Sequence, residues 1–286
     1  MRLAAFPDAA TRRARYPAAA ERAEAVGTET TKALVNSSWT GQALAVLERA
    51  CDHYGGFETW NALAQIRLFP GRLSGLVPWL KGNGRTFPVP SAFEIRPRER
   101  WARFLSYPNP EQVGIFDNGS VRLEQRDTSE IVVRADDHRR SFRGLAKNRR
   151  WTAIDALYFF GYALTHYHSL PFSLFEARLI RASEAGSRSE RLSVLEVELP
   201  PDLPTHSRRQ TFYFDSAGRL TRHDYHAEIV GVWARGAHFW KRQERFAGFP
   251  VSLERHVLAR LGGVAVPVTA LHATFADAEV QLARAV

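Results

Sequence analysis

Residues 152–168 of this 286-residue chain (TAIDALYFFGYALTHYH) have the pattern of a helix without a polar face. Thr152 and Asp155 have the spacing of a helix start, where two side chains satisfy backbone N–H groups of the first turn. Beyond Asp155 the residues are apolar or aromatic almost all round the axis, so the helix must be covered on most sides. We expect it to lie in the cup of a curved sheet or to cap one. Gly161 at its middle would permit close approach of a strand or a ligand.

The rest of the chain is mainly a succession of short strands. Helical spacing predicts a helix at 40–54 and a short turn at 57–62, whereas the basic stretch Asp136–Arg150 is expected to be a loop. Strands are expected at 65–69, 87–95, 101–105, 113–116, 121–125, 192–199, 210–214, 220–230, 237–246, 251–258 and 271–280. Their short connections favour an antiparallel meander over βαβ crossovers. We expect an N-terminal extension at 1–38, then one α+β domain, mainly antiparallel β, at 39–286.

The net charge of +9 comes from 39 basic and 30 acidic residues, and almost all the basic residues are arginine. The arginines are scattered, with short clusters such as Arg139-Arg140, and no zinc-finger or RNP pattern accompanies them. Scattered charge of this kind is typical of a solvated surface. We therefore expect no nucleic-acid partner, whereas an acidic or carboxylate-bearing ligand is compatible with the charge.

Several classes of site are excluded by missing residues. The single cysteine, Cys51, excludes an intramolecular disulfide framework and any multi-cysteine metal site. The chain has no P-loop, G-x-G-x-x-G or G-x-S-x-G motif, and we expect neither a metal nor a cofactor. The longest apolar run, Ala156–Leu164, is far shorter than the ~20 residues that span a bilayer. With no apolar secretory region near residue 1, the chain is expected to be cytoplasmic, with no integral membrane segment.

A resemblance to a known family comes from three stretches. A helix ending in residues 53–61 (HYGGFETWN) leads directly into a strand, and a long meander with one apolar helix follows. With residues 155–168 and 204–231 (PTHSRRQTFYFDSAGRLTRHDYHAEIVG), this arrangement resembles the bacterial LolA/LolB-like lipoprotein-carrier superfamily, particularly its uncharacterised cytoplasmic relatives, over about residues 42–282. The resemblance implies a strongly curved, half-open β-barrel with helices on its concave side and an apolar ligand cup. This chain lacks the carriers' signal peptide and lipidation cysteine, so lipoprotein trafficking is not implied.

The densest polar cluster lies on the strand expected at 220–230. Because strand side chains alternate, His223 and Tyr225 share one face, and Arg222, Asp224 and His226 share the other. The second face is polar and expected to meet solvent, so His223 and Tyr225 point inward. There they would bind a ligand carbonyl or transfer a proton, or else form a core pair satisfied by neighbouring groups. His223 and His226 cannot share a metal ion across the sheet.

Three functions remain open on these residues. The first is a binding protein for a hydrophobic small molecule (a lipid, polyketide or terpenoid), and the second is a cofactor-independent cyclase or isomerase acting on a hydrophobic intermediate. A structural protein whose cup is filled by its own helix is a third possibility. The oligomeric state is not predicted. The candidate ligand-binding residues are Trp79, Trp101, Tyr158, Tyr162, His166, Tyr213, His223, Tyr225, His238 and Trp240, and a cluster of His166, His206, His223 and His238 is possible.

Overall fold

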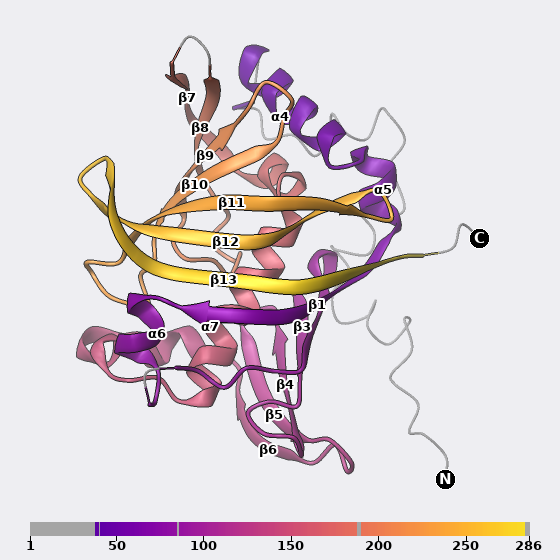
Figure 1. Cartoon of the computed structure of the whole chain (residues 1–286), viewed down its shortest axis with the longest axis vertical. Coiled ribbons are helices and arrows are strands. Elements are labelled where there is room, and N and C mark those ends of the chain that lie inside the picture. Colours follow the sequence, from indigo (N-terminus) through magenta and orange to yellow (C-terminus); the bar gives the residue numbers. More distant parts are fainter. Residues whose placement is uncertain (1–37, 40, 85, 188–189, 284–286) are drawn as a thin grey trace.

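All the strands that the structure describes belong to one antiparallel sheet (Figure 1). The computed structural model describes residues 38–39, 41–84, 86–187 and 190–283. The sheet has 13 strands in the order β6-β5-β4-β3-β2-β1-β13-β12-β11-β10-β9-β8-β7. The expected extension at 1–38 lies outside the described residues, apart from Ser38, so that boundary stays a prediction.

The sheet consists of two meanders joined at its centre. The first contains β1 (Leu63–Ser74), β2 (Ala92–Arg96), β3 (Trp101–Leu105), β4 (Gln112–Asp117), β5 (Ser120–Gln125) and β6 (Ile131–Ala135). The second contains β7 (Arg178–Gly186), β8 (Arg191–Glu198), β9 (Arg209–Phe214), β10 (Leu220–His226), β11 (Arg235–Phe246), β12 (Phe249–Leu261) and β13 (Val264–Leu282). Pairing of β1 with β13 joins the two, and β6 and β7 are the sheet's two edges. The expected curved, half-open antiparallel fold is confirmed, although β6 and β7 were not predicted as strands.

Short helices occupy the connections. They are α4 (Gly41–His53), α5 (Gly56–Ala62), α6 (Leu76–Lys81), η1 (Pro97–Glu99), η2 (His138–Phe142), η3 (Gly144–Asn148) and η4 (Phe172–Glu176). The first two match the predicted helices. The prediction of a loop at 136–150 was wrong in part, because η2 and η3 lie within it. Helix α6 was not predicted; Pro78 lies in its first turn, where proline is tolerated.

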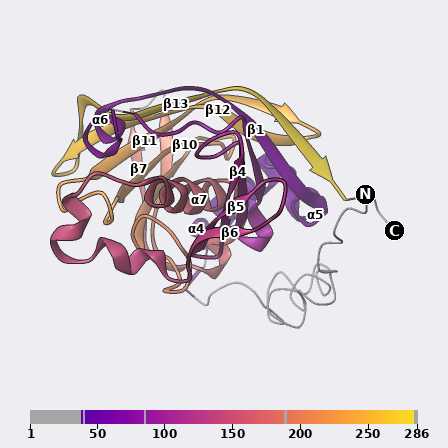
Figure 2. The same cartoon turned by 90° about the horizontal axis from the view of Figure 1, so that it is seen from below.

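Helix α7 (Ala153–Ser169) connects the two meanders and lies under the concave side of the sheet (Figure 2). Thr152 and Asp155 form the expected capping box. The helix is buried except at Ala153, Ile154 and Phe160, which are half-buried, as a helix without a polar face requires. Phe116 of β4 and Phe212 and Phe214 of β9 contribute to the same core. The helix inside the curved sheet therefore brings its own side chains against strands from both meanders.

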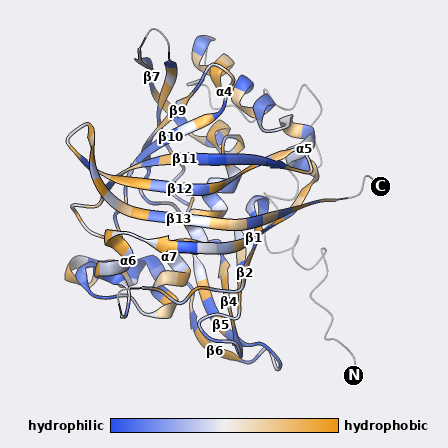
Figure 3. Cartoon of the chain, in the orientation of Figure 1, coloured by the Kyte–Doolittle hydropathy of each residue, from blue (hydrophilic) through white to orange (hydrophobic). Residues whose placement is uncertain are grey.

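Polar and apolar residues are interspersed along the strands, as Figure 3 shows. On β9, Gln210, Phe212 and Phe214 are buried, while Thr211 and Tyr213 between them are half-buried. This alternation gives each strand a concave and a convex face. None of the helices in the described part of the chain is long and apolar enough to cross a membrane.

Candidate functional site

The strand register places His223 and Tyr225 on the concave side, as the alternation predicted. His223 stands opposite Phe212 of β9 on one side and His238 of β11 on the other. His223 has 0% of its surface exposed, and Tyr225 is also buried. On the convex side Asp224 does not meet solvent, contrary to expectation. It is covered by Arg222 and Arg260, whose side-chain nitrogens lie 2.7 and 3.3 Å from its carboxylate.

A group of buried polar side chains fills the space between α7 and this part of the sheet. We call it the histidine cluster, and it consists of Tyr162, His166, Tyr167, His168, His206, Gln210, His223, Tyr225, His238, Trp240 and Arg255. The rings pack closely: His206 stacks on Tyr225 at 4.0 Å between centroids, and Tyr167 meets His238 at 4.8 Å. A polar group of this size is unusual in a core, where burial disfavours each member unless it is hydrogen-bonded.

Gln210 fixes the orientation of two histidines. Its amide nitrogen donates to the Ser207 carbonyl at 2.6 Å, and that carbonyl can only accept. The amide oxygen of Gln210 must therefore face His223 Nε2 at 2.5 Å and His166 Nε2 at 3.4 Å. Both histidines donate from Nε2, so in their neutral forms Nδ1 is the acceptor. Neither Nδ1 atom has a hydrogen-bond partner among the described residues.

Three tyrosines and His206 form a hydrogen-bonded relay. His206 Nδ1 lies 2.9 Å from the Tyr162 hydroxyl, and its Nε2 lies 2.6 Å from that of Tyr167. The Tyr167 hydroxyl lies 3.3 Å from that of Tyr225. The three hydroxyls and the neutral imidazole together carry four exchangeable protons, whereas the three hydrogen bonds use only three of them. When the protons point from Tyr162 toward Tyr225, the spare O–H donor is on Tyr225.

Burial keeps the histidines of the cluster neutral. It lowers the pKa of His166 to about 4 and that of His168 to about 3, and holds the pKa values of His206, His223 and His238 well below the ordinary value. Burial likewise raises the pKa of Tyr162, Tyr167 and Tyr225. At neutral pH these groups therefore act as neutral hydrogen-bond donors and acceptors.

Arg255 of β12 is the one formally charged member of the cluster. Its side chain is buried, and burial lowers its pKa to about 10, which leaves it protonated at pH 7. Its Nη2 lies 3.4 Å from His168 Nε2, the acceptor because His168 Nδ1 donates to the Leu164 carbonyl. The guanidinium also lies over the rings of Trp240 and Tyr167, at 4.2 and 5.0 Å. A desolvated cation–π contact contributes about 2 kcal/mol or more, which offsets part of the several kcal/mol that burying a charge costs.

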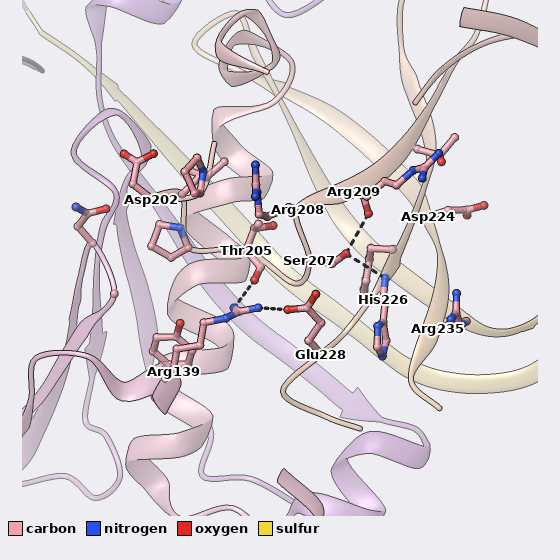
Figure 4. Close-up of a pocket in the computed structure, with 18 of the residues that line it drawn as sticks. Arg139, Asp202, Thr205, Ser207, Arg208, Arg209, Asp224, His226, Glu228 and Arg235 are labelled. Carbon is pink, nitrogen blue, oxygen red and sulfur yellow. Dashed lines mark hydrogen bonds and ion pairs between the residues drawn. The ribbon is translucent and has the colours of Figure 1, made fainter. Parts of the chain in front are cut away.

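An open cleft adjoins the cluster (Figure 4). It has a volume of about 870 Å³, and Tyr158 and Tyr225 line it together with mostly polar residues. Arg139 crosses it, donating to the Thr205 carbonyl at 2.7 Å and to Glu228 at 2.5 Å. Tyr225 belongs both to the cleft and to the histidine cluster, so it connects the buried polar groups to the surface.

The predicted site residues divide into two groups. Tyr162, His166, His223, Tyr225, His238 and Trp240 come together in the cluster, with His206, and Tyr158 lines the cleft. Three others lie elsewhere. Trp79 of α6 is 48% exposed, Trp101 stacks with Arg96 on the convex face, and Tyr213 bonds to Asp224 on that face.

Four members of the cluster were not among the residues predicted for the site: Tyr167, His168, Gln210 and Arg255. The sequence pattern of its own strand could have indicated that Arg255 points inward. Val251, Leu253, Arg255 and Val257 alternate along β12 and all are buried, so the arginine occupies an inward position. Among the described residues, no three His, Cys, Asp or Glu side chains are placed to hold a metal ion.

Comparison with known proteins bears on the fold. No protein-family model matches the sequence, and no curated protein is detectably similar to it. A LolA superfamily protein from Nitrosomonas europaea aligns with 86% of this chain and 96% of its own, at 11% identity and a TM-score of 0.44. A putative outer membrane lipoprotein-sorting protein domain from Vibrio parahaemolyticus aligns with 83% of this chain and 92% of its own, at 11% identity and a TM-score of 0.40.

A DUF1329 family protein from Desulfovibrio piger aligns with 84% of this chain and 94% of its own, at 11% identity and a TM-score of 0.39. The solved structures that align with this chain thus include a protein of the superfamily named in the sequence resemblance. At these identities and TM-scores the likeness concerns the fold and says nothing about a ligand.

Proposed function

We propose that this protein binds a small hydrophobic molecule whose polar oxygen group lies at the histidine cluster. The observation that carries the proposal is the set of buried ring nitrogens without a partner among the described residues: His166 Nδ1, His223 Nδ1 and both nitrogens of His238. A buried polar atom left unpaired costs about 1–3 kcal/mol, and native proteins leave few of them. A ligand hydroxyl would pair with an Nδ1 acceptor, and a ligand carbonyl with a donor on His238 or Tyr225.

The surroundings of these nitrogens favour an apolar body for the ligand. Phe212 stacks on His223 at 4.5 Å between ring centroids, and Trp240 stacks on His238 at 5.5 Å. Val257 lies opposite His238 on the next strand. Ligand pockets commonly combine such apolar walls with a few polar groups that fix orientation. A lipid, polyketide or terpenoid bearing a hydroxyl or carbonyl has this chemistry.

Binding to purified full-length protein tests the proposal. Native mass spectrometry would show a co-purified apolar adduct, and Nile red fluorescence would report an apolar site. We expect His238→Phe to weaken binding about tenfold or more, because a ligand hydrogen bond in a buried site is lost. Tyr213→Phe on the convex face is the matched control and should leave binding unchanged. Absence of both an adduct and Nile red binding would contradict the proposal.

A second candidate is a cofactor-independent cyclase or isomerase, which the relay through His206 favours. Tyr162, His206, Tyr167 and Tyr225 connect the interior to the cleft by hydrogen bonds along which a proton can move. The lowered pKa of His206 makes it a weak base, so we place binding first. Incubating the co-purified molecule with the protein in D₂O separates the two. Deuterium at a ligand carbon, lost in Tyr225→Phe, would indicate proton transfer.

Cytoplasmic location, a single domain and the absence of a nucleic-acid partner stay predictions. Fractionation of cells expressing the tagged chain tests the first of them. Limited proteolysis tests the second, and a filter-binding assay tests the third.

A further inference from the structure

No acid among the described residues pairs with Arg255 on its own side of the sheet. Its strand neighbours Glu254 and His256 point to the convex face, where Glu254 meets His272 at 3.1 Å. Asp224 also lies on that face and is held by Arg222 and Arg260. Every other member of the histidine cluster is neutral. The part of the chain that the structure describes therefore encloses one positive charge beneath α7 without a negative one beside it.

The donors of Arg255 are only partly used. Nη2 donates to His168, whereas Nε and Nη1 have no acceptor among the described residues. Two neighbouring atoms are also unpaired, Trp240 Nε1 and the ring nitrogens of His238. The guanidinium lies over the Trp240 and Tyr167 rings, so aromatic contacts hold its plane while two of its nitrogens are left to donate to a further acceptor.

We propose that Arg255 anchors a carboxylate of the bound ligand, with Trp240 Nε1 and His238 as additional donors. This inference rests on the proposed function and names the ligand class: a hydrophobic carboxylic acid. A guanidinium edge matches a planar carboxylate, which accepts two parallel N–H bonds. One buried cation also balances a single negative charge. A phosphate monoester carries close to two at neutral pH and would leave an excess negative charge buried among neutral groups.

Three probes that share one hydrocarbon body test the anchor: dodecanoate, methyl dodecanoate and dodecyl phosphate. Their Kd values for the full chain are measured by displacement of Nile red. We expect dodecanoate to bind at least about tenfold more tightly than its methyl ester, since charge-assisted bidentate bonds are lost on esterification. In Arg255→Met this preference should fall to about twofold or less, while the affinity for the ester stays unchanged. Arg219→Met removes an exposed arginine and is the charge-matched control, which should keep the preference.

A thermal melt provides a second readout. Arg255→Met should melt at the wild-type temperature or above it without ligand, because an unpaired buried charge has been removed. Dodecanoate should then raise the Tm of the wild type by more than that of the variant, which still binds the hydrocarbon body. If Arg255→Met does not fold, Arg255→Lys keeps the charge without the planar fork and should show a reduced preference for the acid.

The outcomes separate the anchor from the proposed function. Equal binding of acid and ester by the wild type, or tighter binding of the phosphate, would overturn the carboxylate anchor while the hydrophobic site stands. If no dodecyl probe binds but benzoate raises the Tm of the wild type and not of Arg255→Met, the anchor stands and the hydrophobic body is wrong. If benzoate also has no effect, both proposals fail.

Discussion

Gly161 of α7 lies directly against Phe116 of β4. A β-carbon at residue 161 would stand 2.5 Å from both Cβ and Cγ of that phenylalanine, closer than non-bonded carbons approach. The absence of a side chain thus sets how closely α7 packs on the first meander. The close approach expected at Gly161 from the sequence is an approach to a strand.

Gly161→Ala should therefore destabilise the protein, although alanine is the better helix former. Overpacking of a core typically costs about 1–3 kcal/mol, which exceeds the ~1 kcal/mol that alanine gains in a helix. Urea unfolding measures the difference in the free energy of unfolding. Gly263→Ala is the control, because a β-carbon there meets nothing within 4 Å. A rise in stability for Gly161→Ala would mean that α7 moves away from β4 without cost.

Asp155→Asn should cost about 1–3 kcal/mol at pH 7, because it removes the buried carboxylate that accepts from His138, Arg149 and Thr152. Burial raises the pKa of Asp155, but hydrogen bonds from His138, Arg149 and Thr152 outweigh it and hold the pKa well below the ordinary value. The stability that this carboxylate contributes is present above the unfolded-state pKa of about 3.9 and is lost as pH falls below it. The difference in the free energy of unfolding between wild type and variant should become smaller in acid. A difference in the free energy of unfolding that stays constant from pH 7 to pH 3 would contradict this account. Asp127→Asn is the control, because the Asp127 side chain is 90% exposed.

The histidine cluster should make the free energy of unfolding depend on pH in a range above the one in which Asp155 acts. Its histidines have lowered pKa values in the fold, so the unfolded chain takes up protons first as pH falls below about 6.5. Each histidine that stays neutral then removes about 1.4 kcal/mol of stability per pH unit. Denaturant unfolding between pH 7.5 and about pH 5 measures the slope. His238→Gln should reduce it by about the share of one histidine, whereas a slope unchanged in His238→Gln would mean that His238 is protonated in the fold.

Tyr167→Phe should destabilise the protein by about 1–3 kcal/mol, because it leaves His206 Nε2 buried without its partner at 2.6 Å. Tyr213→Phe is the matched change on the convex face. There the lost bond to Asp224 at 3.0 Å leaves a carboxylate still paired with Arg222 and Arg260, so a smaller cost is expected. Thermal melts of the two variants give the comparison. Equal losses would show that the relay adds nothing to stability.

Local periodicity predicted what depends on neighbours along the chain. The helix at 152–168, its capping box and the inward face of the strand that carries His223 and Tyr225 all follow from spacing, and the structure places them as expected. Strands β6 and β7 were not predicted, because they are edge strands whose residues are mostly exposed and show little alternation of buried and exposed side chains.

The composition of the site depends on pairing between distant segments. Arg255 meets Trp240 across β11 and β12, and His168 from α7, and no local pattern brings those three together. Tyr213 shows the converse error: its aromatic ring suggested a ligand contact, yet its buried neighbours Phe212 and Phe214 place it on the convex face. Residue type suggested a ligand contact for Tyr213, but the alternation of side chains along the strand determines which face of the sheet it lies on.

The pairing of β1 with β13 also has a kinetic consequence. Every other strand pair joins strands adjacent in sequence, so each meander can form by pairing of neighbouring segments. The seam between Leu63–Ser74 and Val264–Leu282 must instead wait for segments from opposite ends of the described chain to meet, at a high entropic cost of loop closure. We expect this central seam, rather than either open edge, to form last and to set the folding rate.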